Sequence, residues 1–113
     1  MGKIFKAYLS GTRIYSCAAC GAHLARSEDI ISKLFQGRHG QAYLFDTVVN
    51  VSLGQKEDRV LYTGLHRVAD ISCNVCQNVL GWKYIEAMEP REKYKENKFI
   101  VERPKMAKEK GWQ

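Results

Sequence analysis

Two matching cysteine knuckles, Cys17-Ala-Ala-Cys20 and Cys73-Asn-Val-Cys76, constrain this chain more than any other feature. They contain all four cysteines of the 113-residue sequence, and a leucine, Leu24 or Leu80, follows each knuckle at the same spacing. Two thiolates separated by two residues can bind one metal ion from a tight turn, and two such turns complete a tetrahedral four-sulfur shell. We therefore expect one structural zinc ion bound by Cys17, Cys20, Cys73 and Cys76, which joins two distant hairpins of one domain.

The alternative for the same cysteines is a pair of disulfides or two redox-active motifs. Disulfide frameworks are typical of secreted chains, whereas residues 1–10 contain no apolar stretch long enough for a signal peptide. No run of the sequence approaches the roughly 18 apolar residues of a membrane span. N-myristoylation favours Ser or Thr at the position that Lys6 occupies. We therefore expect an intracellular protein of a reducing compartment, without a membrane partner.

Length and charge distribution predict one domain with a basic C-terminal end. A chain of 113 residues has the usual size of a single domain. The formal net charge is +6, and residues 91–113 contain eight Lys and Arg against four Glu. A mixed run of this kind is usually a solvated face. We divide the chain into an N-terminal segment (1–14), a zinc-binding domain (15–103) and a basic C-terminal tail (104–113).

Extended segments dominate the chain. Turns are predicted at residues 36–40, 54–58 and 63–64, and short helices or loops at Pro90–Lys95 and Pro104–Lys110. The sequence predicts a mainly β, antiparallel domain of roughly seven to nine strands that zinc pins at one end. The predicted extended segments are Lys3–Leu9 (as an edge), Arg13–Cys17, Ile30–Phe35, Ala42–Phe45, Val48–Leu53, Arg59–Tyr62, Leu65–Cys73, Val79–Ala87 and Phe99–Val101.

Several motifs in fixed order resemble the Yippee family, from about Tyr15 to Glu102. One departure is Asn97, where the family usually has Gly; Asn tolerates the left-handed conformation better than most residues. The matching stretches are Cys17-x-x-Cys20-x-x-His23-Leu24, Gly40-x-Ala42-Tyr43-Leu44-Phe45, Val49-Asn50-Val51, Thr63-Gly64-x-His66-x-Val68-x-Asp70-Ile71-x-Cys73, Leu80-Gly81-Trp82-Lys83-Tyr84 and Lys93-Tyr94-Lys95-Glu96-Asn97-Lys98-Phe99-Ile100.

The resemblance implies a fold, a cellular setting and partners. The fold is the β-tent, in which two antiparallel sheets meet at an angle with zinc at the apex, as in the ligand-binding domain of cereblon. The implied setting is the nucleus and cytoplasm, with roles in growth, division or stress survival. The implied partner is a multisubunit ubiquitin ligase of the GID/CTLH type. These remain expectations, because a fold alone does not fix a function.

Catalysis is not expected from these residues. Methionine sulfoxide reductase B, which has a similar fold, needs a nucleophilic thiolate besides its zinc ligands, whereas here the metal uses every cysteine. A closed four-thiolate site also leaves no open position for a water molecule. His23, His39 and His66 remain as candidate bases, but no Ser, Thr or carboxylate partner stands out near them. We predict a protein that is not an enzyme.

An aromatic pocket is the preferred binding hypothesis. Alignment on the second knuckle places Trp82 and Tyr62 at two of the three cage tryptophans with which the cereblon domain binds a flat cyclic imide. Aromatic faces bind flat or cationic groups, at ~0.5–2 kcal/mol per contact. We expect an adaptor that recognises a peptide end, a modified side chain or a small ligand; the alternative puts Trp82 and Tyr84 on opposite strand faces, so that one is ordinary core. The candidate pocket residues are Phe45, Tyr62, His66, Trp82 and Tyr84.

The basic residues indicate an alternative function, nucleic-acid binding at an RNA end. Backbone binding needs a clustered basic face and weakens steeply with salt. Glutamates among the C-terminal lysines reduce the positive electrostatic potential of that face. No helix that could read a base sequence is evident. The candidate residues are Arg38, Arg59, Arg67, Lys105 and Lys108.

Overall fold

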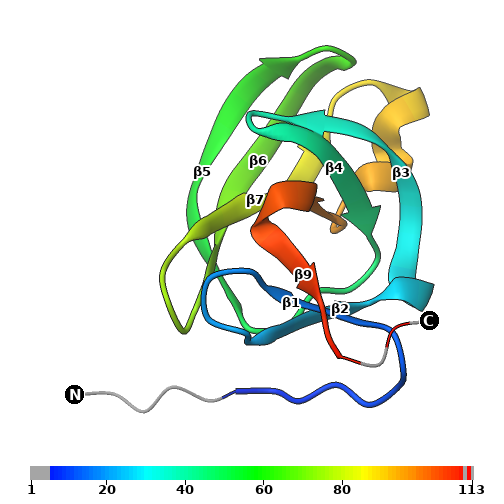
Figure 1. Ribbon diagram of the computed structural model, residues 1–113. Helices are drawn as coiled ribbons and strands as arrows, with labels where there is room; N and C mark the ends of the chain where they lie inside the picture. Colours follow the sequence, from blue (N-terminus) through cyan, green and yellow to red (C-terminus); the bar gives the residue numbers. More distant parts are fainter. Residues whose placement is uncertain (1–5, 111, 113) are drawn as a thin grey trace.

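Two antiparallel sheets form the protein in the computed structural model, which describes residues 6–110 and 112 (Figure 1). The small sheet has the order β2-β1-β9, with β1 at Ile14–Cys17, β2 at His23–Arg26 and β9 at Met106–Lys108. The large sheet has the order β3-β4-β8-β7-β6-β5. Its strands are β3 Ile30–Gly37, β4 Gly40–Phe45, β5 Val51–Leu61, β6 Gly64–Cys73, β7 Val79–Ala87 and β8 Phe99–Glu102.

Three short 3-10 helices complete the described part of the chain: η1 at Ser27–Asp29, η2 at Pro90–Lys95 and η3 at Arg103–Lys105. η2 follows β7 and lies beside β3 at the upper right of Figure 1, away from the small sheet. No helix among the described residues has the length and apolar character to cross a membrane. The predicted mainly β, two-sheet, antiparallel fold is confirmed.

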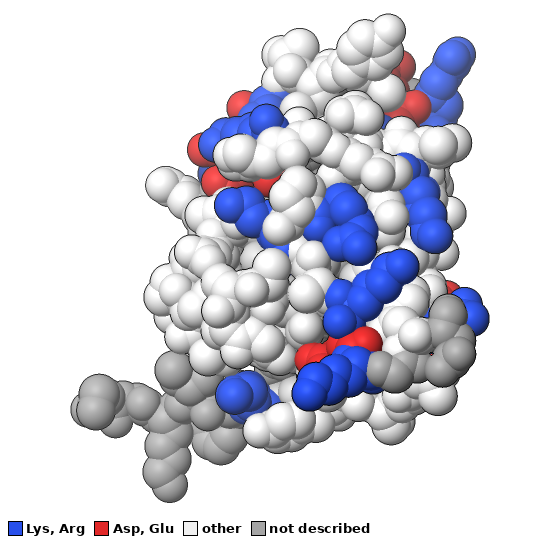
Figure 2. Space-filling model, viewed as in Figure 1, with Lys and Arg blue, Asp and Glu red and all other residues white. Residues whose placement is uncertain are grey.

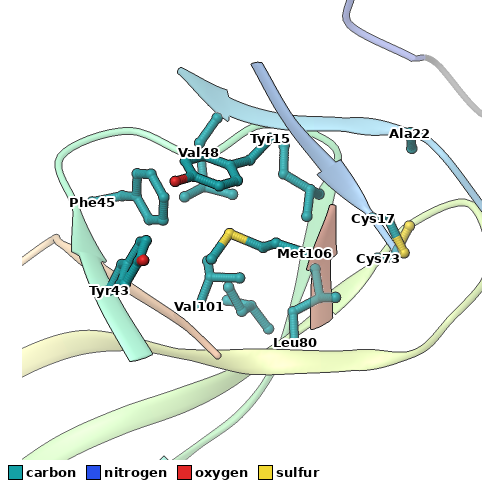
Figure 3. Packing of buried hydrophobic residues seen from close by; sticks show 13 residues of the cluster. Tyr15, Cys17, Ala22, Tyr43, Phe45, Val48, Cys73, Leu80, Val101 and Met106 are labelled. Carbon is teal, nitrogen blue, oxygen red and sulfur yellow. The ribbon is translucent and has the colours of Figure 1, made fainter. Parts of the chain in front are cut away.

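The main core fills the space between the two sheets. Tyr15 of β1 places its ring 6.0 Å from the rings of both Tyr43 and Phe45 of β4 (Figure 3). The two leucines that follow the knuckles, Leu24 and Leu80, are 0% and 1% exposed in this cluster. The repeated leucine therefore has a structural reason: each knuckle places one leucine into the core directly beside the cysteines.

A second cluster lies on the other face of the large sheet. Successive strand residues point to opposite faces, so Tyr43 of β4 faces the main core whereas Leu44 faces the second cluster. Val101 and Ile100 of β8 divide in the same way. Because the central strands are covered on both faces, they appear in the sequence as continuous apolar runs. The second cluster consists of Ala42, Leu44, Val68, Tyr84 and Ile100, with Phe35, Leu61 and Trp82 packed against it.

The polar turn predicted at Gly54–Asp58 is wrong, because these residues lie inside β5. β5 is an edge strand that pairs only with β6 among the described strands, and the pairing is irregular between Leu53 and Lys56. Edge strands commonly carry exposed charges, which discourage pairing with other chains. The polar run therefore marks a sheet edge, and the strand continues through it.

β2 and β9 were not predicted as strands. β9 lies within the segment assigned to a basic tail, yet it pairs with β1 with Met106 opposite Cys17, and Met106 is buried. Of the predicted edge segment Lys3–Leu9, residues 3–5 lie outside the described residues and residues 6–9 form no strand. Asn97 has a φ of 66°, the left-handed conformation expected at this position.

Candidate metal centre and aromatic pocket

The four cysteines meet where a hairpin of the small sheet approaches a hairpin of the large sheet. Their Sγ atoms all lie within 4.8 Å of one another, with 3.6 Å between Cys17 and Cys76 and 3.5 Å between Cys20 and Cys73. Zinc–sulfur bonds of about 2.3 Å separate the sulfurs of a tetrahedral site by about 3.8 Å. The predicted ligands therefore come together, and the donor set fits one zinc ion at the edge of the main core (Figure 3).

The two knuckles share one backbone geometry. The N–H of Cys17 donates to the carbonyl of Ala22 (2.7 Å), and the N–H of Gly21 donates to the carbonyl of Cys17 (2.8 Å). The second knuckle repeats both bonds with Asn78 and Gln77 at the corresponding positions, each at 2.8 Å. Gly21 and Gln77 also share a left-handed φ, 82° and 71°. The sequence repeat is therefore a repeat of the metal-binding turn.

Backbone N–H groups of these turns lie close to the sulfurs. The N–H of Asn78 is the main cause that lowers the pKa of the Cys76 thiol. Burial raises the pKa of the Cys17 thiol, and the N–H groups of Cys20 and Ala19 act in the opposite direction. Zinc binds the thiolate, so metal binding releases protons and weakens as the pH falls.

The histidines have partners that the sequence did not reveal. His39 Nδ1 lies 2.8 Å from Oε1 of Glu102, a buried carboxylate that also accepts the N–H of Arg38. Through these contacts Glu102 of β8 holds the β3–β4 turn. His23 lies beside the first knuckle, where its Nδ1 accepts the N–H of Leu9 at 3.0 Å. The expectation that no carboxylate stands near a histidine is therefore wrong for His39 and also for His23, whose Nε2 lies 3.7 Å from Oε1 of Glu109.

An open cavity of about 620 Å³ lies against the second cluster. Its walls come from β3, the β5–β6 turn, β7 and η2. Tyr62, Trp82 and Tyr84, three of the five candidate residues, line it. The remaining lining residues, which the sequence analysis did not select, are Ser32, Leu34, Phe35, Gln36, Leu61, Thr63, Glu92, Tyr94 and Lys95.

The other two candidates do not line this cavity. Phe45 is fully buried in the main core, because it points to the opposite face of the sheet from Leu44. His66 is also fully buried; its ring lies 5.3 Å from that of Tyr84, and its Nδ1 contacts the carbonyl of Gly64 at 2.9 Å. His66 therefore supports a wall residue without reaching the cavity.

Trp82 and Tyr84 both face the cavity. The alternative that placed them on opposite faces is wrong, because side chains two residues apart in a strand share a face. Their rings are 6.2 Å apart and nearly perpendicular. Burial raises the pKa of Tyr84 to about 12, although the nearby indole of Trp82 acts in the opposite direction. Together they form an aromatic wall that continues the second cluster into the cavity.

Lys95 is the cavity residue that the sequence analysis missed most completely. It was assigned to a solvated basic run, yet its side chain is 2% exposed. Its Nζ donates to Oγ1 of Thr63 at 2.9 Å and pairs with the carboxylate of Glu92. A Glu–Lys pair three residues apart in a basic run gives no sequence signal of burial, since the same pattern is common on exposed helices.

The five basic candidates do not form one cluster. Arg38, Arg59 and Lys105 line a smaller cavity of about 160 Å³, together with the acidic Asp70 and Glu102. Figure 2 shows Lys and Arg running down one face of the molecule, with acidic side chains at several points among them.

The other two basic candidates have different partners. Arg67 lies 3.0 Å from Asp58 and 3.6 Å from Glu86. The Lys108 ammonium lies 4.7 Å from the ring of Trp112. Neither of them lines the smaller cavity.

Comparisons with known proteins agree with this geometry. A family model described as "Yippee zinc-binding/DNA-binding /Mis18, centromere assembly" matches residues 13–113. Protein yippee-like 3 of Homo sapiens is 58% identical over 111 residues, which cover 97% of this chain and 93% of that protein. Protein yippee-like 4 of Homo sapiens is 55% identical over 111 residues, which cover 97% and 87%.

A solved structure shares the fold at low sequence identity. The crystal structure of the Mis18 "Yippee-like" domain superposes with a TM-score of 0.68 and 14% identity, covering 89% of this chain and 98% of that one. At this identity the likeness concerns the architecture alone.

Proposed function

The chain belongs to the Yippee zinc-binding family, and we propose that it is a non-enzymatic adaptor that binds a segment of a partner protein in the aromatic cavity. Membership in the family and the four clustered cysteines confirm the predicted single zinc ion as cofactor. Four thiolates saturate a tetrahedral zinc ion, so the metal acts as a structural element in this proposal. The cavity, which lies against the second cluster, supplies the binding function.

The observation that carries the proposal is the exposure of the apolar side chains at the cavity mouth. Tyr62, Leu34 and Tyr94 are 105%, 92% and 56% exposed. They come from three separate segments, the β5–β6 turn, β3 and η2. Large apolar side chains that gather around a concave site are typical of binding surfaces, whereas singly scattered ones are normal.

The cellular part of the proposal follows from the family resemblance. We place the adaptor in the nucleus and cytoplasm and associate it with a ubiquitin ligase of the GID/CTLH type, in growth or stress control. In that setting the cavity recruits a partner to the ligase or joins the chain to it.

The test is affinity capture from native extract with rim variants and nuclease treatment. Tyr62→Ser removes a rim side chain that packs on nothing, so folding is unchanged. Val60→Ser is the matched control, because Val60 of β5, two residues before Tyr62, is 84% exposed but does not line the cavity. Partners that survive nuclease, remain with Val60→Ser and are lost with Tyr62→Ser would support the adaptor. Equal capture by all three proteins would contradict it.

A second candidate is nucleic-acid binding at the cavity lined by Arg38, Arg59 and Lys105. It is favoured by the basic residues that the fold brings together there and by the words "DNA-binding" in the family description. Against it, Arg59 already pairs with Glu57 and with Asp70, the latter at 2.9 Å. Arg38→Ala with Lys105→Ala would weaken such binding and reduce its salt dependence. Partner capture lost on nuclease treatment would favour this candidate over the adaptor.

A further inference from the structure

The ammonium group of Lys95 occupies a cage of aromatic rings. Its Nζ lies 5.3 Å from the ring centroids of Phe35 and Tyr84 and 5.9 Å from that of Tyr94. These distances are within the range of cation–π attraction. The three rings come from β3, β7 and η2, which are also walls of the cavity. The arrangement is the one in which proteins bind a quaternary or methylated ammonium, but here the chain supplies the cation itself.

The charge of this internal cation is balanced within the cavity. The Glu92 carboxylate pairs with Nζ, and Thr63 accepts a second N–H at 2.9 Å. The contact with Lys95 also lowers the pKa of Glu92, which favours the ionised form of this carboxylate. The other lining residues are uncharged. The two charges cancel, so the cavity has no net charge. The Lys95 ammonium repels a cationic ligand, and the Glu92 carboxylate repels an anionic one.

The cavity wall nevertheless has buried polar atoms, one donor and one acceptor, without hydrogen-bond partners. An ammonium has three donors; Lys95 donates one of them to Thr63 and forms an ion pair with Glu92. The indole Nε1 of Trp82 is buried and has no hydrogen-bond partner among the described residues. An indole N–H is a donor only, and an unpaired buried donor is costly. Oε1 of Glu92 is likewise buried and, although it pairs with Lys95, has no hydrogen bond of good geometry among the described residues. A group that brings an acceptor for the indole N–H together with a donor for this carboxylate oxygen, as a carboxamide does, satisfies both.

We infer that the cavity selects a flat, uncharged group with a hydrogen-bond acceptor, such as a carboxamide of a partner protein, and that Lys95 determines this selectivity. The inference rests on the proposed function, since it specifies what the adaptor's cavity binds. The aromatic walls stack on the flat group, the Lys95–Glu92 pair excludes ions, and the donors of Trp82 and Lys95 bind the acceptor. Of the flat and cationic groups that aromatic faces bind in general, this cavity takes the flat, uncharged ones.

The test compares four probes built on one phenyl ring: benzamide, benzoate, phenyltrimethylammonium and toluene. Binding to the zinc-loaded protein is followed by NMR through the indole N–H signal of Trp82. The indole of Trp112, which donates to the carbonyl of Ile14 in the small sheet, provides an internal control. We expect benzamide to bind about tenfold more tightly than phenyltrimethylammonium, the ratio that about 1.4 kcal/mol of cation–π and charge discrimination produces. Benzoate and toluene are expected to bind more weakly than benzamide.

If Lys95 determines the selectivity, removing its charge should reverse the preference between the uncharged and the cationic probe. Lys95→Met keeps a similar shape but leaves the three rings and the Glu92 carboxylate without a cation, so phenyltrimethylammonium should become the preferred probe. Lys95→Met with Glu92→Gln removes both charges and should lose the preference for the cation. The double variant also serves if the unpaired Glu92 prevents the single variant from folding.

Each other outcome overturns the inference in a distinguishable way. Tightest binding of phenyltrimethylammonium or benzoate by the wild type contradicts the selectivity but leaves the proposed adaptor standing. Equal binding of toluene and benzamide contradicts the role of the acceptor. A Trp82 signal that no probe shifts contradicts both the inference and the proposed function of the cavity.

Discussion

Two of the four zinc ligands, Cys17 and Cys73, belong to the core as well as to the metal site. Cys73 is 0% exposed and Cys17 is 2% exposed, and both are members of the main core cluster. A ligand in this position has two roles, since it completes the metal shell and fills space between the sheets. Structural zinc binding is linked to folding by ~10–16 kcal/mol in finger peptides, which is comparable to the whole stability of a domain, about 5–15 kcal/mol.

Cys73→Ser should therefore abolish both zinc binding and folding. The hydroxyl is a poor zinc ligand, and it would be buried where the sulfur was. Zinc content by mass spectrometry and far-UV circular dichroism measure the two losses. Ala18→Ser, an exposed change inside the first knuckle, is the control and should keep both. A Cys73→Ser protein with one zinc ion and an unchanged melting temperature would show that the site is not structural.

The Lys95–Glu92 pair makes part of the stability depend on pH. The Lys95 hydrogen bond lowers the pKa of Glu92 in the folded protein below its ordinary value. The pair therefore stabilises the fold fully above the unfolded pKa, and this contribution is lost as the pH falls through the folded pKa. The difference in free energy of unfolding between wild type and Glu92→Gln should be largest near neutral pH and shrink below about pH 4.

Urea denaturation at several pH values measures this difference. Zinc release in acid affects wild type and variant alike, so it cancels from the comparison. Glu28→Gln is the control, because the Glu28 side chain is 76% exposed and its nearest basic partner, Arg26, is 3.9 Å away. A constant difference across the pH range would mean that Lys95 does not interact with an ionised Glu92.

Among the elements, β7 and β8 approach each other unusually closely at Gly81. A Cβ atom there would lie 1.9 Å from the carbonyl oxygen and 2.8 Å from the carbonyl carbon of Ile100. Both atoms belong to the backbone of the neighbouring strand, so no side-chain movement can relieve the overlap. Gly81 thus permits the sheet spacing beside Trp82, the main aromatic residue of the cavity wall.

Gly81→Ala should consequently destabilise the protein by about 3 kcal/mol or more. Thermal unfolding of the zinc-loaded protein measures the loss. Gly54→Ala in β5 is the matched control: its Cβ would lie 3.5 Å from the carbonyl of Asp70, an ordinary contact, so the change should stay within about 1 kcal/mol. Equal melting temperatures for the two variants would contradict the close approach.

The sequence predicted some elements well, for reasons that particular strands make clear. β7 was predicted with its observed bounds, because an apolar run between a knuckle and a proline has few alternatives. β5 was interrupted in the prediction, since the charges of an edge strand resemble those of a turn. β2 and β9, with four and three residues, are too short to show a period and form through pairing with β1.

The candidate site, too, could be predicted only in part. The zinc ligands follow from spacing alone, because CxxC encodes a local turn. The cavity depends on contacts between β3, β7 and η2, which are distant in the sequence. Aromatic residues next to the second knuckle indicated Trp82 and Tyr84, but the burial of Lys95 arises only when those elements assemble. Local patterns carry no information about such a contact.

At the scale of the whole molecule, zinc joins the two sheets. Cys17 and Cys20 flank the β1–β2 turn of the small sheet, whereas Cys73 and Cys76 flank the β6–β7 turn of the large sheet. The large sheet also has the second cluster on its other face, which does not involve the metal. The small sheet has three strands of four, four and three residues, so it depends more on the zinc and on the main core.

Removal of zinc by a chelator should therefore loosen the small sheet first. Amide hydrogen exchange would show early loss of protection in β1, β2 and β9, with slower exchange retained in β4, β7 and β8. Restored protection after added zinc is the control for irreversible damage. Simultaneous loss in both sheets would show that the large sheet cannot remain folded without the metal.

The pairing of β1 with β9 has a mechanical consequence. Tyr15 lies opposite Lys108 and Cys17 lies opposite Met106. The first and the last of the described strands, β1 and β9, therefore run antiparallel to each other. A force that pulls the chain apart from its two ends first breaks the contacts of Ala7, Leu9 and Trp112. It then loads the Ile14–Glu109 bond and, after it, the ladder one bond at a time. Such a ladder unzips at low force, because its bonds are loaded in succession. The opening would stop at Cys17, where a zinc–thiolate bond takes the load, so the metal acts as a mechanical stop for the fold.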